Sequence, residues 1–503
     1  MHTIADPVLY AAQVAACKIA VIDGNTSLTY ATLHQRCQAL AGILTSLGLS
    51  KGDRVAILAA NSHHYITTYL GVPAGGFVVV PLNMRHAEAE LLYALQDSGT
   101  RVLLTDRDAP ALAGCVEHVI RIDTQLDKLL ANANAIELGK DVSENDLAGL
   151  FYTGGTTGKS KGVMLSHRNL IANTFHYMTV VPQQESDVML VMAPLFHAAG
   201  SNGVLANVWT LGTQVTLAAF DPAVALDLIE QHAVTESLGV PTMLSALAEL
   251  QLTTPRRTES LRMLAHGGSP IATEILRRTH AAFPSAELVE VYGATELSPL
   301  CTVLTNEQNL IDSPLARSCG RPIVGCTINI LNVDGREVKR GEIGEVVVRG
   351  PNVMQGYWNK LEQTAAVLKQ SAYWTGDLGY MNADGYLFLV DRSKDMIVTG
   401  GENVYCTEVE EVLFKFPAIL EAAVFGVPDT KWGEAVWAVV VPRSGQEIDV
   451  AALLEFCRKN IANYKVPKGI DVQLQPLPKS GPGKILKREL RAPFWQNADR
   501  AIN

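Results

Sequence analysis

Residues 152–162, Tyr-Thr-Gly-Gly-Thr-Thr-Gly-Lys-Ser-Lys-Gly, are the most informative stretch of this 503-residue chain. They place four glycines, three threonines, one serine and two lysines in eleven positions, directly after the apolar run 147–151. Glycine lets a backbone approach an anion closely and turn its N–H groups toward it. Threonine adds hydroxyl groups, and lysine adds a mobile positive charge. The composition therefore predicts a loop that holds the phosphates of a nucleotide.

Two other interpretations of this loop compete with that prediction. A Walker A loop has the pattern G-x-x-x-x-G-K-[ST]. Gly158-Lys159-Ser160 fits its end, but Thr153 stands where its first glycine is required. A Gly/Thr hairpin without any ligand is the third interpretation, and the two lysines and the serine argue against it.

Composition narrows the class of protein. At ~100–200 residues per domain the chain should hold two to four compact units. Hydrophobic residues make up 48% and charged residues 18%, which favours a large core over disorder. The net charge of −10 argues against a nucleic-acid binder. Residues 458–503 are an exception with ten Lys/Arg and three Asp/Glu, which indicates a local anion site or a solvated helix face.

Cysteine usage and targeting signals indicate a cytoplasmic protein without membrane insertion. The eight cysteines form no C-x-x-C pair and no zinc-like spacing, so we expect reduced thiols. The first residues lack the basic and apolar regions of a signal peptide. The longest apolar run, 70–82, is too short to span a bilayer.

Helix and strand signals alternate over the first two thirds of the chain, which predicts a mostly parallel α/β architecture. Helical spacing covers 28–47 and 223–232. The expected strands are 54–60, 77–81, 101–105, 118–122, 188–192, 214–218 and 261–265.

The pattern changes after about residue 318. Two hairpins with Asp-Gly turns are expected, pairing 327–333 with 345–348 and 377–381 with 386–390. The polar run 391–395 predicts a joint between an N-terminal domain, 1–390, and a C-terminal domain, 391–503. The expected fold class is α/β. A large N-terminal domain holds mostly parallel sheets and a small antiparallel β subdomain, and a smaller α+β C-terminal domain is mobile.

Further Gly-rich motifs occur at separated positions. They are His266-Gly-Gly-Ser-Pro270, Val291-Tyr-Gly-Ala-Thr-Glu296, Tyr373-Trp-Thr-Gly-Asp377, Thr399-Gly-Gly-Glu-Asn-Val-Tyr405 and Lys479-Ser-Gly-Pro-Gly-Lys484. Together with 152–162 they resemble the adenylate-forming (ANL) superfamily, which contains acyl-CoA synthetases, firefly luciferases and nonribosomal-peptide adenylation domains. The resemblance runs from about Leu28 to Leu490 and is nearest to the fatty-acid and aryl acid–CoA ligases.

The resemblance implies a ligase that works in two half-reactions. A carboxylate attacks the α-phosphate of ATP, pyrophosphate leaves, and the thiol of coenzyme A then attacks the acyl-adenylate. Glu296 would hold Mg²⁺, Thr295 would bind the α-phosphate, and Lys484 would bridge the carboxylate and the α-phosphate. The residues implied around the β- and γ-phosphates are Thr153, Gly154, Gly155, Thr156, Thr157, Gly158 and Lys159.

The remaining roles also come from the resemblance. Tyr292 would stack on adenine beside Gly293 and Ala294, with Gly267, Gly268 and Ser269 on the other side. Asp377 and Arg392 would bind the ribose. Lys394 would be the hinge about which the C-terminal domain rotates, and the pantetheine of CoA would pass Gly400, Gly401, Glu402 and Asn403.

The acyl pocket is expected after the aromatic segment 194–200, with His197 at its entrance. The implied lining is His197, Ser201, Gly203, Val240, Ala294, Leu297 and Ser298. These residues are small or apolar and include no Lys or Arg, so an apolar monocarboxylic acid is favoured over a dicarboxylic acid.

Departures from the family pattern are mild. Gly154 replaces a usual serine, Cys406 a usual proline and Ser480 a frequent threonine.

Four alternative functions stay open: an adenylating enzyme that delivers to a carrier protein, an aminoacyl module using Asp221, an acyl-AMP ligase, or a non-catalytic nucleotide sensor. A homodimer is a further possibility.

Overall fold

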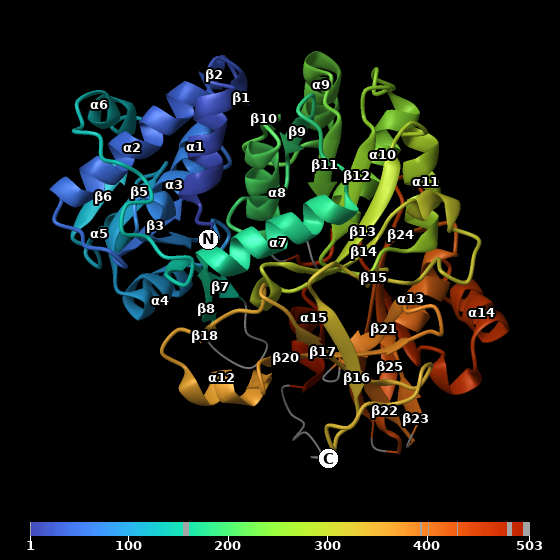
Figure 1. Cartoon of the computed structure of the whole chain (residues 1–503). Coiled ribbons are helices and arrows are strands. Elements are labelled where there is room, and N and C mark those ends of the chain that lie inside the picture. Colours follow the sequence, from blue (N-terminus) through green and yellow to red (C-terminus); the bar gives the residue numbers. More distant parts are fainter. Residues whose placement is uncertain are drawn as a thin grey trace.

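Four β-sheets and their helices build the molecule, which is a computed structural model (Figure 1). The structure describes residues 2–153, 160–392, 395–400, 402–429, 431–479 and 485–495. The Arg392 side chain lies outside this description. Within these ranges no helix is both long and apolar enough to cross a lipid bilayer.

The first sheet has seven strands in the order β18-β8-β7-β4-β3-β5-β6. Its strands β3 to β7 run parallel, and β8 and β18 are antiparallel additions at one edge. The strands are β3 (Arg54–Leu58), β4 (Val78–Pro81), β5 (Thr100–Thr105), β6 (His118–Arg121), β7 (Leu147–Thr153), β8 (Lys161–Ser166) and β18 (Gly356–Tyr357). Both faces of β3 and β4 are buried, which explains their continuous apolar sequence.

The second sheet has nine strands in the order β15-β14-β13-β12-β11-β9-β10-β1-β2. The central strands are parallel, as the alternating pattern predicts. Its strands are β1 (Ile19–Asp23), β2 (Thr26–Thr29), β9 (Val188–Val191), β10 (Thr213–Thr216), β11 (Glu236–Gly239), β12 (Met263–Gly267), β13 (Glu287–Gly293), β14 (Leu300–Leu304) and β15 (Arg321–Pro322).

Helices cover the two sheets and pack between them. Side chains of α2, α3 and α8 share one hydrophobic cluster with strands of both sheets. Ser166 and Asn169 form a capping box at α7, and Asp221 accepts two backbone hydrogen bonds at the start of α9. The helices of this part are α1 (Ala5–Val14), α2 (Tyr30–Ser46), α3 (His63–Ala74), α4 (Glu88–Ser98), α5 (Pro110–Ala113), α6 (Leu126–Ala131), α7 (His167–Val180), α8 (Ala198–Trp209), α9 (Pro222–His232), α10 (Pro241–Thr253), α11 (Thr273–Ala282), η1 (Thr295–Leu297) and η2 (Glu307–Asn309).

The third sheet is antiparallel, as expected after residue 318. The turn at Gly385 joins β20 to β21 as predicted. The other predicted pairing, of 327–333 with 345–348, is formed by β16 and β17, which place Thr327 opposite Arg349 and Leu331 opposite Glu345. The connection between them is longer than a tight turn, because Leu331 also bridges to Glu337 and β17 begins only at Gly344. The elements are β16 (Thr327–Leu331), β17 (Gly344–Arg349), α12 (Leu361–Val367), β19 (Leu368–Lys369), β20 (Ala372–Met381) and β21 (Leu387–Arg392).

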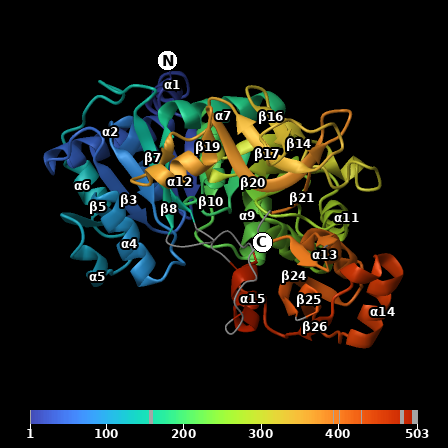
Figure 2. The same cartoon turned by 90° about the horizontal axis from the view of Figure 1, so that it is seen from below.

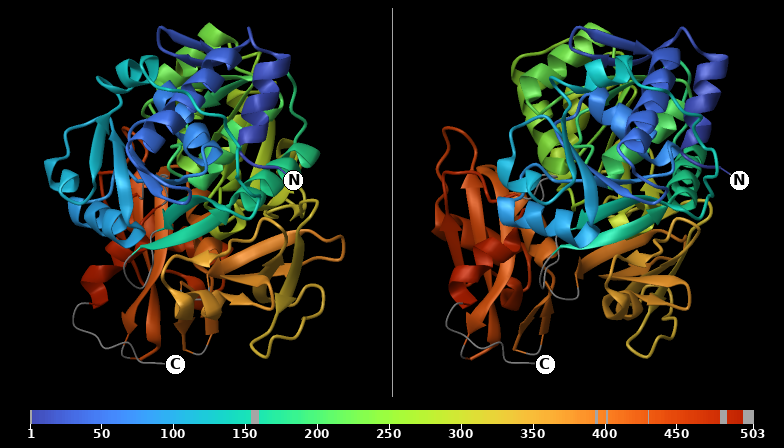
Figure 3. Two further views of the ribbon diagram at one scale, coloured as in Figure 1. Left: turned by 60° about the vertical axis from the view of Figure 1, so that its left-hand side comes forward. Right: turned by 90° about the vertical axis from the view of Figure 1, so that its left-hand side faces the viewer.

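The C-terminal part has its own sheet and hydrophobic cores. Figures 2 and 3 draw it in red as a separate body at one side of the larger N-terminal part. The Thr273 hydroxyl donates to Glu411 across this boundary at 3.0 Å, and Arg443 lies 3.6 Å from Glu249. The elements are β22 (Ile397–Thr399), β23 (Glu402–Val404), α13 (Cys406–Phe414), β24 (Ile419–Asp429), β25 (Gly433–Pro442), α14 (Val450–Asn460), η3 (Asn463–Lys465), β26 (Gly469–Val472) and α15 (Lys487–Trp495).

Candidate active site

The predicted site residues gather at one edge of the nine-stranded sheet. Parallel strands end at the same edge, and ligands of α/β proteins bind outside those carboxyl ends. Val240 follows β11, Gly267 ends β12 and Gly293 ends β13. The segment with His197 follows β9, so three separate motifs and Val240 meet at this edge.

Two of the glycines at this edge are required by close packing. A β-carbon on Gly267 would lie 2.2 Å from the carbonyl oxygen of Val291, and one on Gly293 would lie 1.9 Å from that of Pro299. Gly268 has a φ of +80°, which favours glycine. Gly268 and Ser269 are partly or fully exposed, so they are open to a ligand.

Glu296 is held in place by a residue that sequence analysis missed. The hydroxyl of Tyr357 donates to Glu296 Oε1 at 2.7 Å. Lys161, at the exit of the 154–160 loop, places its amine 4.7 Å from the centre of the same Tyr357 ring. The strand that follows the predicted phosphate loop therefore begins beside the predicted metal ligand. Thr295 and Glu296 are both half-buried in η1, and a carboxylate with access to water suits Mg²⁺, which retains several waters.

Tyr292 and Asp377 approach each other from two different sheets. The Tyr292 hydroxyl donates to Asp377 Oδ2 at 2.7 Å. Burial, with the Asp377 charge as the next cause, raises the pKa of Tyr292 well above its usual value, so the phenol stays protonated. The β20–β21 register sets Arg392 opposite Asp377, which brings the two predicted ribose residues together in the backbone. Ala294 packs beside Tyr292 on the main core.

If Asp377 binds the ribose as predicted, Asp377→Ala should raise KM for ATP roughly 10–100-fold, because its charge-assisted hydrogen bonds to the ribose hydroxyls would be lost. Steady-state pyrophosphate release at varied ATP measures this. Tyr292→Phe is the matched control: it removes the partner of Asp377 but keeps the ring, and KM should change little. An unchanged KM for ATP in Asp377→Ala would contradict the prediction that Asp377 binds the ribose.

His197 occupies the N-cap position of α8, where its side chain makes no capping hydrogen bond. Burial, followed by the positive charges of His86 and Arg85, lowers its pKa to about 3. Its ring packs on Phe196 at 4.4 Å between centroids, and Nε2 has no hydrogen-bond partner among the described residues. A neutral ring at the strand edge can donate one N–H to a carboxylate without carrying charge.

Several predicted residues lie outside the described part of the chain. They are Gly154, Gly155, Thr156, Thr157, Gly158, Lys159, Lys394, Gly401, Lys484 and the side chain of Arg392. The flanking strands are still informative, because β7 and β8 are antiparallel and pair Thr153 with Lys161. A Walker A loop connects a strand to a helix. The loop here connects two strands, which contradicts the Walker A interpretation.

The predicted CoA residues lie on the β22–β23 hairpin of the C-terminal part. Thr399 pairs with Glu402, and Gly400 takes a φ of +58° in the turn. Glu402 and Asn403 are exposed. Cys406, just after the hairpin, is fully buried, and its N–H donates to Asp391 at 2.8 Å. The Cys406 thiol is packed in the core, and all eight cysteines are free.

A narrow cavity of about 30 Å³, open to solvent at one end, lies between α7, α8 and the nine-stranded sheet. Of the predicted acyl-pocket residues only Gly203 lines it. The hydroxyls of Ser201 and Ser298 donate to Leu195 and Asn352 carbonyls, so both are engaged elsewhere. His197, Val240, Ala294 and Leu297 lie at the strand edge rather than in this cavity. The lining is Tyr177, Gln183, Met189, Ala199, Asn202, Gly203, Glu236, Ser237, Leu238, Met263, Val291 and Leu300.

Family models match this chain over most of its length. One described as AMP-binding enzyme matches residues 10–358, and one described as AMP-binding enzyme C-terminal domain matches residues 408–484. The chain belongs to the AMP-binding enzyme family. The predicted superfamily and fold class are confirmed, as is the enzyme class of AMP-forming acyl-CoA ligases.

Individual relatives agree with this membership. A feruloyl-CoA synthase of Amycolatopsis sp is 40% identical over 479 residues, covering 94% of this chain and 96% of that one. ATP-bound MatB from Rhodopseudomonas palustris has a TM-score of 0.90 at 30% identity, with 98% and 99% coverage. MenE from Bacillus subtilis, solved with ATP and a magnesium ion, has a TM-score of 0.85 at 31% identity, with 96% and 98% coverage. These structures agree with the predicted use of ATP and Mg²⁺.

Proposed function

We propose that this AMP-binding enzyme converts an apolar monocarboxylic acid to its CoA thioester in two steps. A carboxylate oxygen bonds to the α-phosphorus of ATP while the bond from that phosphorus to the bridging oxygen breaks, and pyrophosphate leaves. The CoA thiolate then bonds to the acyl carbon, and AMP leaves with the carboxylate oxygen. The observation that supports this best is the meeting of Glu296, Tyr357 and the end of the phosphate loop at the strand edge.

Adenylation brings an anion to a polyanion, so the site must neutralise charge. Glu296 would hold Mg²⁺, which supplies charge stabilisation on the phosphates when bound. Thr295 donates a hydroxyl to the α-phosphate, and the neutral His197 orients the carboxylate. Tyr292 and Asp377 fix the nucleoside. Among the described cavity residues no Lys or Arg is present to pair with a second carboxylate, which favours a monocarboxylic acid.

The thioester step is proposed to need rotation of the C-terminal domain about Lys394. Rotation would carry the β22–β23 hairpin with Gly400 and Glu402 to the adenylate. A hinge residue must absorb a large backbone change. We expect Lys394→Pro, which fixes φ, to slow thioester formation from supplied acyl-adenylate at least about tenfold more than ATP–pyrophosphate exchange. Equal effects on both steps would contradict a hinge at this residue.

A panel of carboxylic acids tests the overall assignment. Wild-type protein with ATP and Mg²⁺ should release pyrophosphate with some aliphatic or aryl monocarboxylic acids, and acyl-CoA should form only when CoA is added. Pyrophosphate release without thioester formation would instead favour delivery to a carrier protein. An enzyme that activates amino acids would need an acidic side chain to bind the amino group, and Asp221 was the candidate. Its carboxylate instead accepts two backbone N–H groups at the start of α9.

A further inference from the structure

Asp97 lies in the last turn of α4, a position where the helix itself disfavours a carboxylate. The carbonyl groups at the C-terminal end of a helix carry partial negative charge and attract cations. The Asp97 side chain is nevertheless largely buried, with 10% of its surface exposed. Tyr93 of the same helix donates to its Oδ1 at 3.2 Å, and the other donors come from distant parts of the chain. Those distant contacts show which segments Asp97 holds together.

One contact of the Asp97 carboxylate is with the strand that enters the predicted phosphate loop. The Tyr152 hydroxyl donates to Asp97 Oδ2 at 2.8 Å. Burial, followed by this hydrogen bond, raises the pKa of Tyr152 well above its ordinary value, so the phenol remains a donor. Tyr152 pairs with Gly162 across β7 and β8, and a β-carbon on Gly162 would lie 3.2 Å from the Tyr152 ring. The ring therefore lies against the strand that leaves the loop.

The other contacts of Asp97 are with the segment that follows β18. Lys360 places its amine 3.1 Å from Asp97 Oδ1, and the indole N–H of Trp358 donates to the Asp97 carbonyl at 2.9 Å. The backbone N–H of Trp358 donates in turn to the Gly162 carbonyl at 2.8 Å. Asp97 is therefore joined to both strands that flank the loop, directly through Tyr152 and indirectly through Trp358.

The segment that follows β18 also supports the predicted metal ligand. Tyr357, beside Trp358, donates to Glu296 at 2.7 Å. The Arg54 guanidinium lies 5.7 Å from the centre of the Trp358 ring and donates to a backbone carbonyl at the end of α4 at 2.7 Å. The end of α4 that carries Asp97 thus contacts the residue next to the one that orients Glu296.

We propose that Asp97 is a positioning residue for adenylation. Its carboxylate holds the entry of the phosphate loop through Tyr152 and, through Lys360, the segment that supports the metal ligand. This inference rests on the proposed function and adds a residue that acts through other side chains. A misplacement of about 1 Å can cost roughly 100-fold in rate, so a distant clamp can affect the reaction. The effect should be confined to the first half-reaction, because pyrophosphate has left before CoA attacks.

Asp97→Asn tests this role, because the amide keeps the shape of the side chain but loses the charge and one acceptor oxygen. ATP–pyrophosphate exchange should fall roughly tenfold and the Mg²⁺ midpoint should rise, whereas KM for the acid should change less than about twofold. Thioester formation from supplied acyl-adenylate and CoA should stay within about twofold of wild type. Equal loss in the two half-reactions, or wild-type exchange, would overturn the inference.

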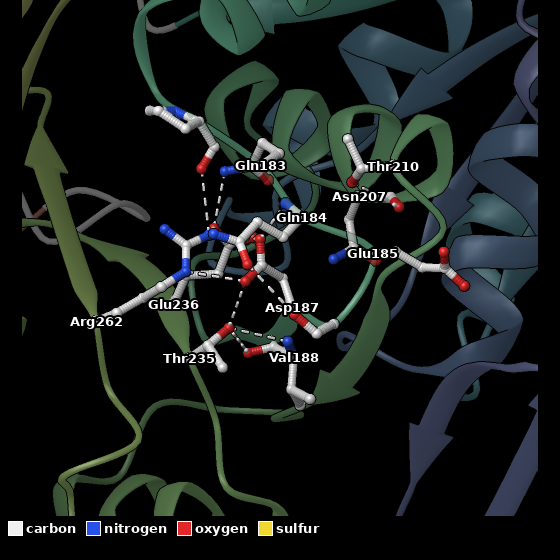
Figure 4. Close-up of polar contacts among 12 residues, drawn as sticks. Gln183, Gln184, Glu185, Asp187, Val188, Asn207, Thr210, Thr235, Glu236 and Arg262 are labelled. Carbon is white, nitrogen blue, oxygen red and sulfur yellow. Dashed lines mark hydrogen bonds and ion pairs between the residues drawn. The ribbon is translucent and has the colours of Figure 1, made fainter.

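Asp187→Asn is the matched control for a carboxylate that only stabilises the fold. The Asp187 side chain is 2% exposed and accepts from Arg262 Nε at 2.9 Å (Figure 4). It precedes β9, at the opposite edge of the nine-stranded sheet from the nucleotide motifs. This variant should lower the melting temperature and leave the ratio of the two half-reaction rates unchanged. A change of that ratio as large as in Asp97→Asn would show that destabilisation alone produces the effect, and would overturn the inference.

Tyr152→Phe tests the route of the effect and stays informative if Asp97→Asn does not fold. It removes the hydroxyl that donates to Asp97 but keeps the ring, so exchange should fall by a smaller factor while thioester formation persists. Adding Asp97→Asn to Tyr152→Phe should lower exchange by less than Asp97→Asn does alone, since both changes remove the same hydrogen bond. Wild-type exchange in Tyr152→Phe, or factors that multiply fully, would overturn the inference. Absence of pyrophosphate release by the wild-type protein with every acid would instead overturn the proposed function.

Discussion

Replacing Lys484 by alanine should lower acid-dependent ATP–pyrophosphate exchange roughly 100–1000-fold, the cost of removing one group that stabilises transition-state charge. A lysine is suited to bridge the carboxylate and the α-phosphate because it is a compact charge on a long stem. The neighbouring lysines cannot replace it. Lys479 pairs with Glu421 at 2.5 Å and Lys487 with Glu410 at 2.7 Å, so both amines are held by carboxylates.

The second half-reaction provides the internal comparison for this variant. Thioester formation from supplied acyl-adenylate and CoA should proceed near the wild-type rate, because the adenylate already exists. Arg488→Ala is the matched control for exchange, since it removes an exposed cation of the same segment in an assay without CoA. Equal loss in both half-reactions of Lys484→Ala would show that the lysine has no specific role in adenylation.

Glu296→Gln should reduce kcat for adenylation by roughly 100–1000-fold and raise the Mg²⁺ concentration needed for half-maximal rate. Glutamine keeps the shape of the side chain and an oxygen that can accept from Tyr357, so the local fold should persist. What is removed is the negative charge that would hold the cation. A magnesium titration of pyrophosphate release measures the effect.

Tyr357→Phe distinguishes positioning by Tyr357 from metal binding by Glu296. It removes the hydroxyl that orients Glu296 but leaves the carboxylate, so the Mg²⁺ midpoint should shift less than in Glu296→Gln. Thermal unfolding of both variants provides the stability control. If Glu296→Gln kept the wild-type magnesium midpoint, the metal assignment would be wrong.

Local sequence signals predicted much of the fold. The helix expected over 223–232 is α9, which begins where the Asp221 side chain accepts two backbone N–H groups. The short buried strands 54–60, 77–81 and 101–105 are β3, β4 and β5. Apolar runs bounded by turn residues carry this information within a few residues of chain.

Contacts between segments far apart in the chain could not be predicted from the sequence. The strand β1 lies beside β10, and Val21 pairs with Gln214 nearly two hundred residues later. Tyr357 and Glu296 are 61 residues apart and belong to different motifs. Glu236 lines the cavity with Met189 and Met263, which lie on two neighbouring strands of the sheet. The chemical motifs were readable because each is local, whereas the pocket is formed by packing of distant segments.

Transfer of oxygen from acid to nucleotide tests the central claim most directly. The substrate acid is labelled with oxygen-18 in its carboxylate and incubated with ATP, Mg²⁺, CoA and the wild-type protein. AMP is expected to carry one labelled oxygen, pyrophosphate none, and acyl-CoA the other. Unlabelled AMP, or the formation of ADP and phosphate, would contradict an acyl-adenylate intermediate.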